Sequence, residues 1–87
     1  MNTLELRIVT PRQVILEARA TSVIVPGSEG DFEVLWNHTP LVSALRPGRV
    51  VALVDGVARD IEVTGGFVEV TPGRVQVLAG KEGLTPP

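Results

Sequence analysis

Few side chains in this chain of 87 residues could carry out acid-base or nucleophilic chemistry. His38 is the single histidine, and it could act as a general acid or base beside a nucleophile such as Ser43 and a carboxylate such as Asp31. These three residues follow no spacing typical of a catalytic site. A histidine placed in a turn or at an interface explains His38 more simply, so we predict no catalytic residues.

Metal and phosphate sites are not predicted either. Cysteine is absent, and one histidine among dispersed carboxylates makes no ligand pair with metal-binding spacing. Residues 27–30 and 64–66 are rich in glycine, but no Lys-Ser or Lys-Thr pair follows them and no helix is expected to present its amides there. We interpret both segments as tight turns and expect no metal and no bound cofactor.

Acidic and aromatic side chains gather between positions 29 and 36. Glu29, Asp31 and Glu33 form a negative patch that could meet a basic partner or simply be a solvated loop. Phe32 and Trp36 are two of the three aromatic residues, and they either fill the core or anchor a protein interface. The residues by themselves therefore favour a small domain that docks on another protein.

The composition points to one small, folded, all-β domain. Gly 9 and Pro 7 interrupt the chain too often for long helices, and valine, isoleucine and threonine favour pleated strands. The hydrophobic fraction of 44% with 21% charged residues is ordinary for a folded chain. This length leaves no room for a second domain.

Charge and hydropathy exclude several classes of protein. The net charge is −2 and the eight cations are scattered, so the basic patch typical of nucleic-acid binding is missing. The first residues lack the basic start and apolar run of a signal peptide, and no apolar stretch approaches the ~18 residues of a membrane span. We therefore expect a protein kept on the cytoplasmic side, without direct membrane insertion.

Hydrophobic alternation predicts the strands. Residues 4–10 alternate Leu4, Leu6 and Ile8 with polar side chains until Pro11, and the two apolar clusters of residues 12–25 favour two strands. Later, Val68, Val70, Val75 and Val77 share the inward parity.

Two turns are predicted in the second half of the chain. Asp55-Gly56 favours a two-residue hairpin between residues 49–54 and 57–63, in a register that places Arg49 opposite Glu62 as an ion pair. Pro72-Gly73 cannot form a type I′ turn because L-proline cannot take a positive φ, so we expect a wider loop there. Eight to ten short strands add up to a sandwich or flattened barrel over residues 1–80, followed by a flexible tail, residues 81–87.

Several blocks of sequence carry a family resemblance. They are Ile8-Val9-Thr10-Pro11, Gly27-Ser28-Glu29-Gly30-Asp31-Phe32, His38-Thr39-Pro40-Leu41, Leu45-Arg46-Pro47-Gly48, Thr64-Gly65-Gly66-Phe67-Val68-Glu69-Val70 and Val75-Gln76-Val77-Leu78-Ala79. In this order and spacing, the chain resembles the amino-terminal domain of the epsilon subunit of F-type ATP synthases. The resemblance covers residues 4–79.

The resemblance implies a flattened, ten-stranded β-sandwich of two sheets that does no chemistry itself. Such a domain would join the gamma subunit to the c-ring at the cytoplasmic face of the bacterial inner membrane. By similarity, Glu29 and Asp31 would face the c-ring loops. Thr10, His38 and Ser43 match positions on the gamma-facing side.

The chain departs from the family pattern in three places and at its end. Glu33 stands where a glycine is usual, Trp36-Asn37 replaces a proline-glycine pair, and Thr39 replaces a frequent alanine. Family members continue into a pair of α-helices that block ATP hydrolysis and in some members fold over ATP. The eight residues after Ala79 cannot form such a helix, so we expect neither the inhibitory arm nor bound nucleotide; whether the chain is naturally short or a fragment stays open.

Another class of small all-β module is the biotinyl or lipoyl carrier. A carrier needs a lysine at the tip of an exposed hairpin. The sole lysine, Lys81, lies in the tail, whereas the hairpin tips are Asp55-Gly56 and Pro72-Gly73. The sequence therefore favours the stalk subunit over the carrier.

Overall fold

All the regular secondary structure in the part that the structure describes is β-strand. The structure is a computed structural model that describes residues 2–80, so the tail predicted for residues 81–87 and its Lys81 lie outside the described part. The strands are β1 (Leu4–Val9), β2 (Val14–Ala20), β3 (Ser22–Gly27), β4 (Gly30–Val34), β5 (Leu41–Leu45), β6 (Gly48–Val54), β7 (Val57–Val63), β8 (Gly66–Thr71) and β9 (Arg74–Ala79). The all-β prediction is confirmed, but residues 2–80 contain nine strands rather than ten.

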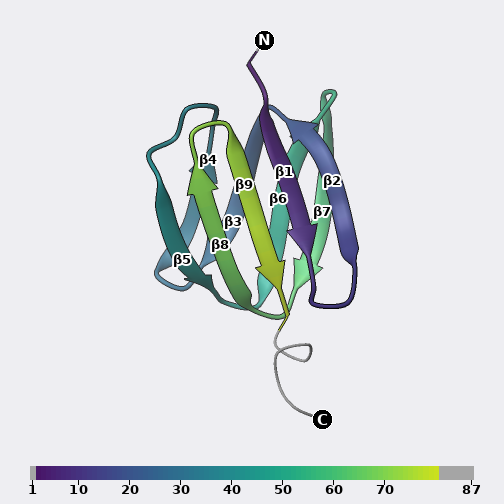
Figure 1. The fold of residues 1–87 in the computed structure, drawn as a ribbon, viewed down its shortest axis with the longest axis vertical. Helices are drawn as coiled ribbons and strands as arrows, with labels where there is room; N and C mark the ends of the chain where they lie inside the picture. The colour runs from purple at the N-terminus through teal and green to yellow at the C-terminus, as the bar shows by residue number, and fades with distance from the viewer. Residues whose placement is uncertain (1, 81–87) are drawn as a thin grey trace.

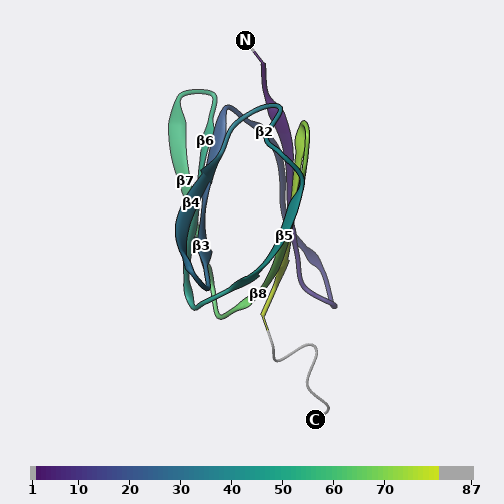
Figure 2. The same ribbon diagram turned by 90° about the vertical axis from the view of Figure 1, so that its left-hand side faces the viewer.

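The strands form one continuous sheet that curls into two layers. The hydrogen-bonded order is β2-β1-β9-β8-β5-β3-β6-β7, with β4 also paired to β3. Figure 2 shows β1, β2, β5, β8 and β9 in one layer and β3, β4, β6 and β7 in the other. A single residue pair, Gly27 with Leu45, joins the layers between β3 and β5. The two-layer sandwich is therefore one sheet folded on itself.

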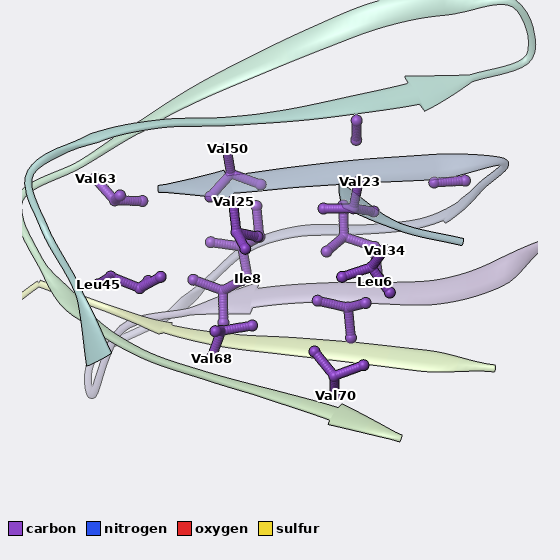
Figure 3. Close-up of a cluster of buried hydrophobic side chains, with 14 of the residues drawn as sticks. Leu6, Ile8, Val23, Val25, Val34, Leu45, Val50, Val63, Val68 and Val70 are labelled. Carbon is purple, nitrogen blue, oxygen red and sulfur yellow. The ribbon is translucent and has the colours of Figure 1, made fainter. Parts of the chain in front are cut away.

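The two layers enclose an aliphatic core. Leu4, Leu6 and Ile8 of β1 are fully buried, as their alternation predicts. In Figure 3, Leu6 and Ile8 point toward Val23, Val25 and Val34 of the facing layer. The four inward valines of β8 and β9, Val68, Val70, Val75 and Val77, are also buried, so their predicted parity is confirmed.

The β6–β7 hairpin has the predicted register but a different ion pair. Asp55 (φ 51°) and Gly56 (φ 79°) both take the positive φ of a type I′ turn, and Arg49 is the cross-strand partner of Glu62. Arg49 Nη1 nevertheless lies 3.6 Å from Asp60 Oδ2, two residues away from Glu62. The predicted pairing with Glu62 is wrong because a long side chain can reach the diagonal neighbour on the same face.

The Pro72-Gly73 turn contradicts the wider loop that we predicted. Thr71 pairs directly with Arg74, so the loop is only two residues long. Gly73 has φ 84°, as position i+2 of a type II turn requires, and proline suits position i+1. Proline excludes the type I′ turn but leaves this second tight turn available.

Candidate functional site

The acidic loop, which we define as residues 27–31, lies at the lower end of the sandwich in Figure 1. It connects β3 to β4, whose pairing continues to Gly27 and Gly30. Gly27 is required here, because a Cβ atom at this position would come within 2.7 Å of the Gly30 carbonyl oxygen and 2.9 Å of the Phe32 ring. The loop is therefore a tight, closely packed turn that presents acidic side chains.

The end of β5 and the connection between β5 and β6 hold this loop in place. The amide of Ser28 donates to the Ala44 carbonyl (2.9 Å), and the amide of Arg46 donates to the Pro26 carbonyl (3.0 Å). The guanidinium of Arg46 donates to the Gly27 carbonyl and forms an ion pair with the Asp31 carboxylate. Arg46 thus fixes the backbone of the acidic loop and compensates the charge of Asp31.

Glu29 is the acidic side chain of this loop that has no partner among the described residues 2–80. Its residue is exposed, and within residues 2–80 its carboxylate has no hydrogen bond or ion pair. Asp31 is also exposed but is engaged by Arg46. The structure therefore places Glu29 and Asp31, the two predicted interface residues, in one loop. Within residues 2–80 only Asp31 forms an ion pair.

Thr10 follows β1 in the turn that leads to β2. Its Oγ1 accepts hydrogen bonds from the amides of Arg12 and Gln13, each at 3.2 Å, and its own amide donates to the Gln13 carbonyl (2.9 Å). The turn lies at the lower end of the sandwich. The hydroxyl of Thr10 thus shapes a local turn rather than pointing at a reactive group.

His38 lies in the β4–β5 connection, at the upper end of the sandwich in Figure 1. Its Nδ1 is 2.7 Å from the carbonyl oxygen of Thr39, the following residue. In the same connection Asn37 has φ 69°, and Trp36 is 48% exposed beside the Gly73 turn. Of the two alternatives for the aromatic residues, Trp36 is a surface side chain, whereas Phe32 packs partly buried against the core.

Ser43 lies in the middle of β5 and is half-buried opposite Val68 of β8. Its hydroxyl donates to the carbonyl of Ala44 at 2.9 Å. Thr10 and His38 lie at opposite ends of the sandwich, so Thr10, His38 and Ser43 do not form one cluster. Within residues 2–80, His38 has no hydrogen bond to a hydroxyl group and no ion pair with a carboxylate.

One feature of the surface was not predicted from the sequence. Four apolar residues are in register on the outer face of the layer that contains β1, β5, β8 and β9. We call them the apolar row: Ala44 of β5, Phe67 of β8, Leu78 of β9 and Val9 of β1. Phe67 is 50% exposed and Leu78 is 43% exposed. The signal in the sequence is that Phe67 and Leu78 are large apolar residues at outward-facing strand positions, next to the buried Val68 and Val77.

The apolar row continues beyond its four residues. A bulge between Ile8 and Val9 pairs Val9 with Val14, which is itself exposed, and so extends the row onto β2. A shallow cavity of about 190 Å³ opens beside it, lined by Val9, Thr10, Pro11, Phe67, Leu78 and Ala79. Thr10 is the predicted interface residue that borders this surface.

Other chemistries find no support in the described residues. Residues 2–80 hold no group of three or more histidine, aspartate or glutamate side chains that could bind a metal ion. Within the same residues no helix is long and apolar enough to cross a membrane.

Comparisons with known sequences agree on one family. Residues 3–81 match the model described as "ATP synthase, Delta/Epsilon chain, beta-sandwich domain". Among the similar curated proteins are two that are called ATP synthase epsilon chain. The one from Symbiobacterium thermophilum is 44% identical over 80 residues, and the one from Bordetella petrii is 42% identical over 80 residues. These alignments cover 91% of this chain but only 58% and 57% of the relatives.

Comparison with solved structures shows the same fold. A chain of the Euglena gracilis mitochondrial ATP synthase, from a cryo-EM structure of its OSCP/F1/c-ring part, superimposes with a TM-score of 0.84 at 23% identity. A chain of the Tetrahymena thermophila mitochondrial ATP synthase central stalk and c-ring gives a TM-score of 0.70 at 18% identity. The matches cover 91% and 87% of this chain, and 51% and 62% of those chains.

Proposed function

The chain belongs to the family of the β-sandwich domain of ATP synthase delta and epsilon chains, and we propose that it is a non-catalytic subunit of the central stalk of a proton-translocating F-type ATP synthase. In this role it joins the gamma subunit to the c-ring and couples proton flow to ATP synthesis. It works at the cytoplasmic face of the bacterial inner membrane.

The family match over residues 3–81 is the observation that carries this proposal. Curated relatives that are 42% and 44% identical are called ATP synthase epsilon chain, and a similar fold occurs in a central stalk and c-ring structure. The closed aliphatic core agrees with such a role, because a closely packed interior deforms little under load.

The contacts that we propose form two groups of residues. Glu29 and Asp31, at the lower end, face the polar loops of the c-ring, where basic side chains would complement them. Thr10, His38 and Ser43 belong to the gamma-facing side. Because these three residues are far apart, gamma would have to wrap around the domain to touch all of them.

Deleting this protein from its host is expected to abolish proton-coupled ATP synthesis, because rotation of the c-ring would no longer be transmitted to gamma. ATP synthesis is measured in inverted membrane vesicles energised by a respiratory substrate. Re-expressing the chain should restore synthesis, whereas an empty vector should not. Vesicles that synthesise ATP at the wild-type rate without the protein would refute the proposed function.

Asp31→Arg is expected to weaken attachment of the subunit to the c-ring about tenfold, because it places a cation opposite the basic loops. The amount of subunit that stays with membranes during washing measures the effect. This change also removes the internal ion pair with Arg46. Glu29→Arg has no such side effect within residues 2–80 and should weaken attachment similarly.

Arg46→Gln is the matched control for both substitutions. It breaks the pair with Asp31 but leaves both acidic charges in place. If c-ring attachment depends on acidic charge, Arg46→Gln should retain the subunit on membranes at least as well as the wild type. Loss of attachment in Arg46→Gln but not in Glu29→Arg would mean that the shape of the loop matters and not its charge.

A further inference from the structure

The two ends of the curled sheet are edge strands with free backbone groups. β2 is at one end of the strand order and β7 is at the other, so within residues 2–80 each has a hydrogen-bonded neighbour on one side only. Figure 1 shows β2 along the right-hand margin of the domain. The outer side of an edge strand presents unpaired amide and carbonyl groups, which can bind another strand. Either edge could therefore extend the sheet with a strand from another molecule.

The inward side chains distinguish the two edges. β7 directs Arg59 inward, because Arg59 pairs with Ala52, whose side chain is fully buried. An inward charge on an edge strand opposes the addition of a further strand. The inward positions of β2 are instead Leu16, Ala18 and Ala20, which pair with the three buried residues of β1. β2 is therefore the edge that is open to strand addition.

The hydrogen bonds of β1 show which backbone groups of β2 are free. The amide of Glu5 donates to the carbonyl of Gly73, next to β9, so Glu5 directs its backbone groups toward β9. This direction alternates along a strand, so Arg7 does the same. Their partners in β2 are Arg19 and Glu17, which are therefore not hydrogen-bonded to them. The amides and carbonyls of Glu17 and Arg19 point to the open edge.

The charges of these two residues suit a second copy of the same strand. An antiparallel pair of β2 strands with Ala18 on the two-fold axis places Glu17 of each copy opposite Arg19 of the other. Within residues 2–80 Arg19 has no ion pair, and its Nε donates to Thr3 Oγ1 (3.1 Å). The side chain of Glu17 is 65% exposed, although it pairs with Arg7. Symmetry supplies both complements from one sequence, which favours a second copy over an unrelated strand.

We infer that β2 is a self-association edge, at which two copies of this chain join their sheets through antiparallel β2 strands with Ala18 on the two-fold axis. Each Glu17–Arg19 pair exchanges both of its backbone hydrogen bonds and carries opposite charges on the outer face. The inference goes beyond the proposed function and does not depend on it, because it concerns copies that are not held in a synthase. Short edge strands bury little surface, so the dimer should be weak, with a Kd on the order of 0.1 mM.

Sedimentation equilibrium of the purified chain measures this association. The mean mass of the wild type should rise toward that of a dimer between about 10 μM and about 1 mM protein. Arg19→Glu should weaken the association about tenfold, because it places two carboxylates opposite each other in both pairs. Arg59→Glu is the matched control: it reverses an exposed arginine on β7, the other edge, and should leave the affinity within about twofold.

Mixing two variants tests the register. Glu17→Arg should also self-associate poorly, because arginines would then face each other in both pairs. An equimolar mixture of Glu17→Arg and Arg19→Glu should associate about tenfold more tightly than either variant by itself, since the arginines of one chain face the carboxylates of the other.

Amide hydrogen exchange gives a second readout on the wild type. The amides of Glu17 and Arg19 should exchange about fourfold more slowly at the highest concentration than at the lowest, because dimerisation covers them. The amide of Ala18 points to β1, so its exchange should not change with concentration.

Thermal unfolding of each variant separates lost association from lost folding, and the exchange measurement on the wild type decides if Arg19→Glu does not fold. A wild type that stays monomeric at the highest concentration would overturn the inference. An association that Arg19→Glu does not weaken, or protection that appears at β7 in place of Glu17 and Arg19, would overturn it as well. None of these results bears on the proposed function, which the ATP synthesis measurement tests separately.

Discussion

Gly66→Ala is expected to remove a large part of the stability of the domain. Gly66 begins β8 with φ 121°, and a Cβ atom there would come within 2.0 Å of the Leu78 carbonyl oxygen in β9. Relief of this clash requires β8 and β9 to separate, which disturbs the ladder between Gly66 and Ala79. Backbone strain and overpacking together should cost on the order of 4 kcal/mol. A domain of this size has a total stability of about 4–12 kcal/mol.

Urea unfolding followed by circular dichroism measures this loss. Gly30→Ala is the matched control, because Gly30 also has a strongly positive φ, 135°, but an added Cβ would have no neighbour within 4 Å. Gly30→Ala should therefore lose only the conformational part, about 1 kcal/mol. Equal losses in the two variants would show that the φ angle alone, and not the contact with β9, makes Gly66 necessary.

Leu6→Ala is expected to lower the free energy of unfolding by about 3 kcal/mol. Leu6 is fully buried in β1 and points across the sandwich toward Val23 and Val34 (Figure 3). Its removal leaves a cavity between two layers that are held by strand ladders and cannot easily collapse into it. The same urea titration measures the effect, and an unchanged slope with denaturant would show that the unfolding transition stays comparable.

Leu53→Ala is the control for this prediction. Leu53 belongs to β6 but faces outward, so truncating it should cost less than about 1 kcal/mol. If Leu53→Ala destabilises the domain as much as Leu6→Ala, the buried face of the sandwich has been assigned incorrectly. A compact core also matters for the proposed role, because a subunit that transmits rotation must resist deformation.

Much of the fold follows from local pattern. Alternation in β1, β8 and β9 identifies the buried side chains, because successive residues of a strand point to opposite faces. Asp55-Gly56 likewise predicts the register of the β6–β7 hairpin, since a two-residue turn leaves one way to pair the strands. The turn at Pro72-Gly73 was missed because more than one tight turn suits a Pro-Gly pair.

The candidate surfaces were less predictable than the core. Glu29 and Asp31 are close in sequence, so their common loop could be expected, but the partner of Asp31 could not. Arg46 is fifteen residues away from Asp31 in the sequence. It lies beside Asp31 because the end of β5 pairs with the end of β3. Arg49 shows the same limit at short range, because its rotamer selects Asp60 over the directly opposite Glu62.

The sequence by itself determined most of the strands, their inward faces and the Asp55-Gly56 turn, because these depend on residues that are near one another along the chain. Only the tertiary structure decided which distant strands pair, including the parallel contact of β1 with β9 and the contact of β5 with β8. These long-range registers align Ala44, Phe67, Leu78 and Val9, which are scattered along the chain, into one apolar row. A hydrophobic pattern says which face a side chain takes, but not which distant strand lies beside it.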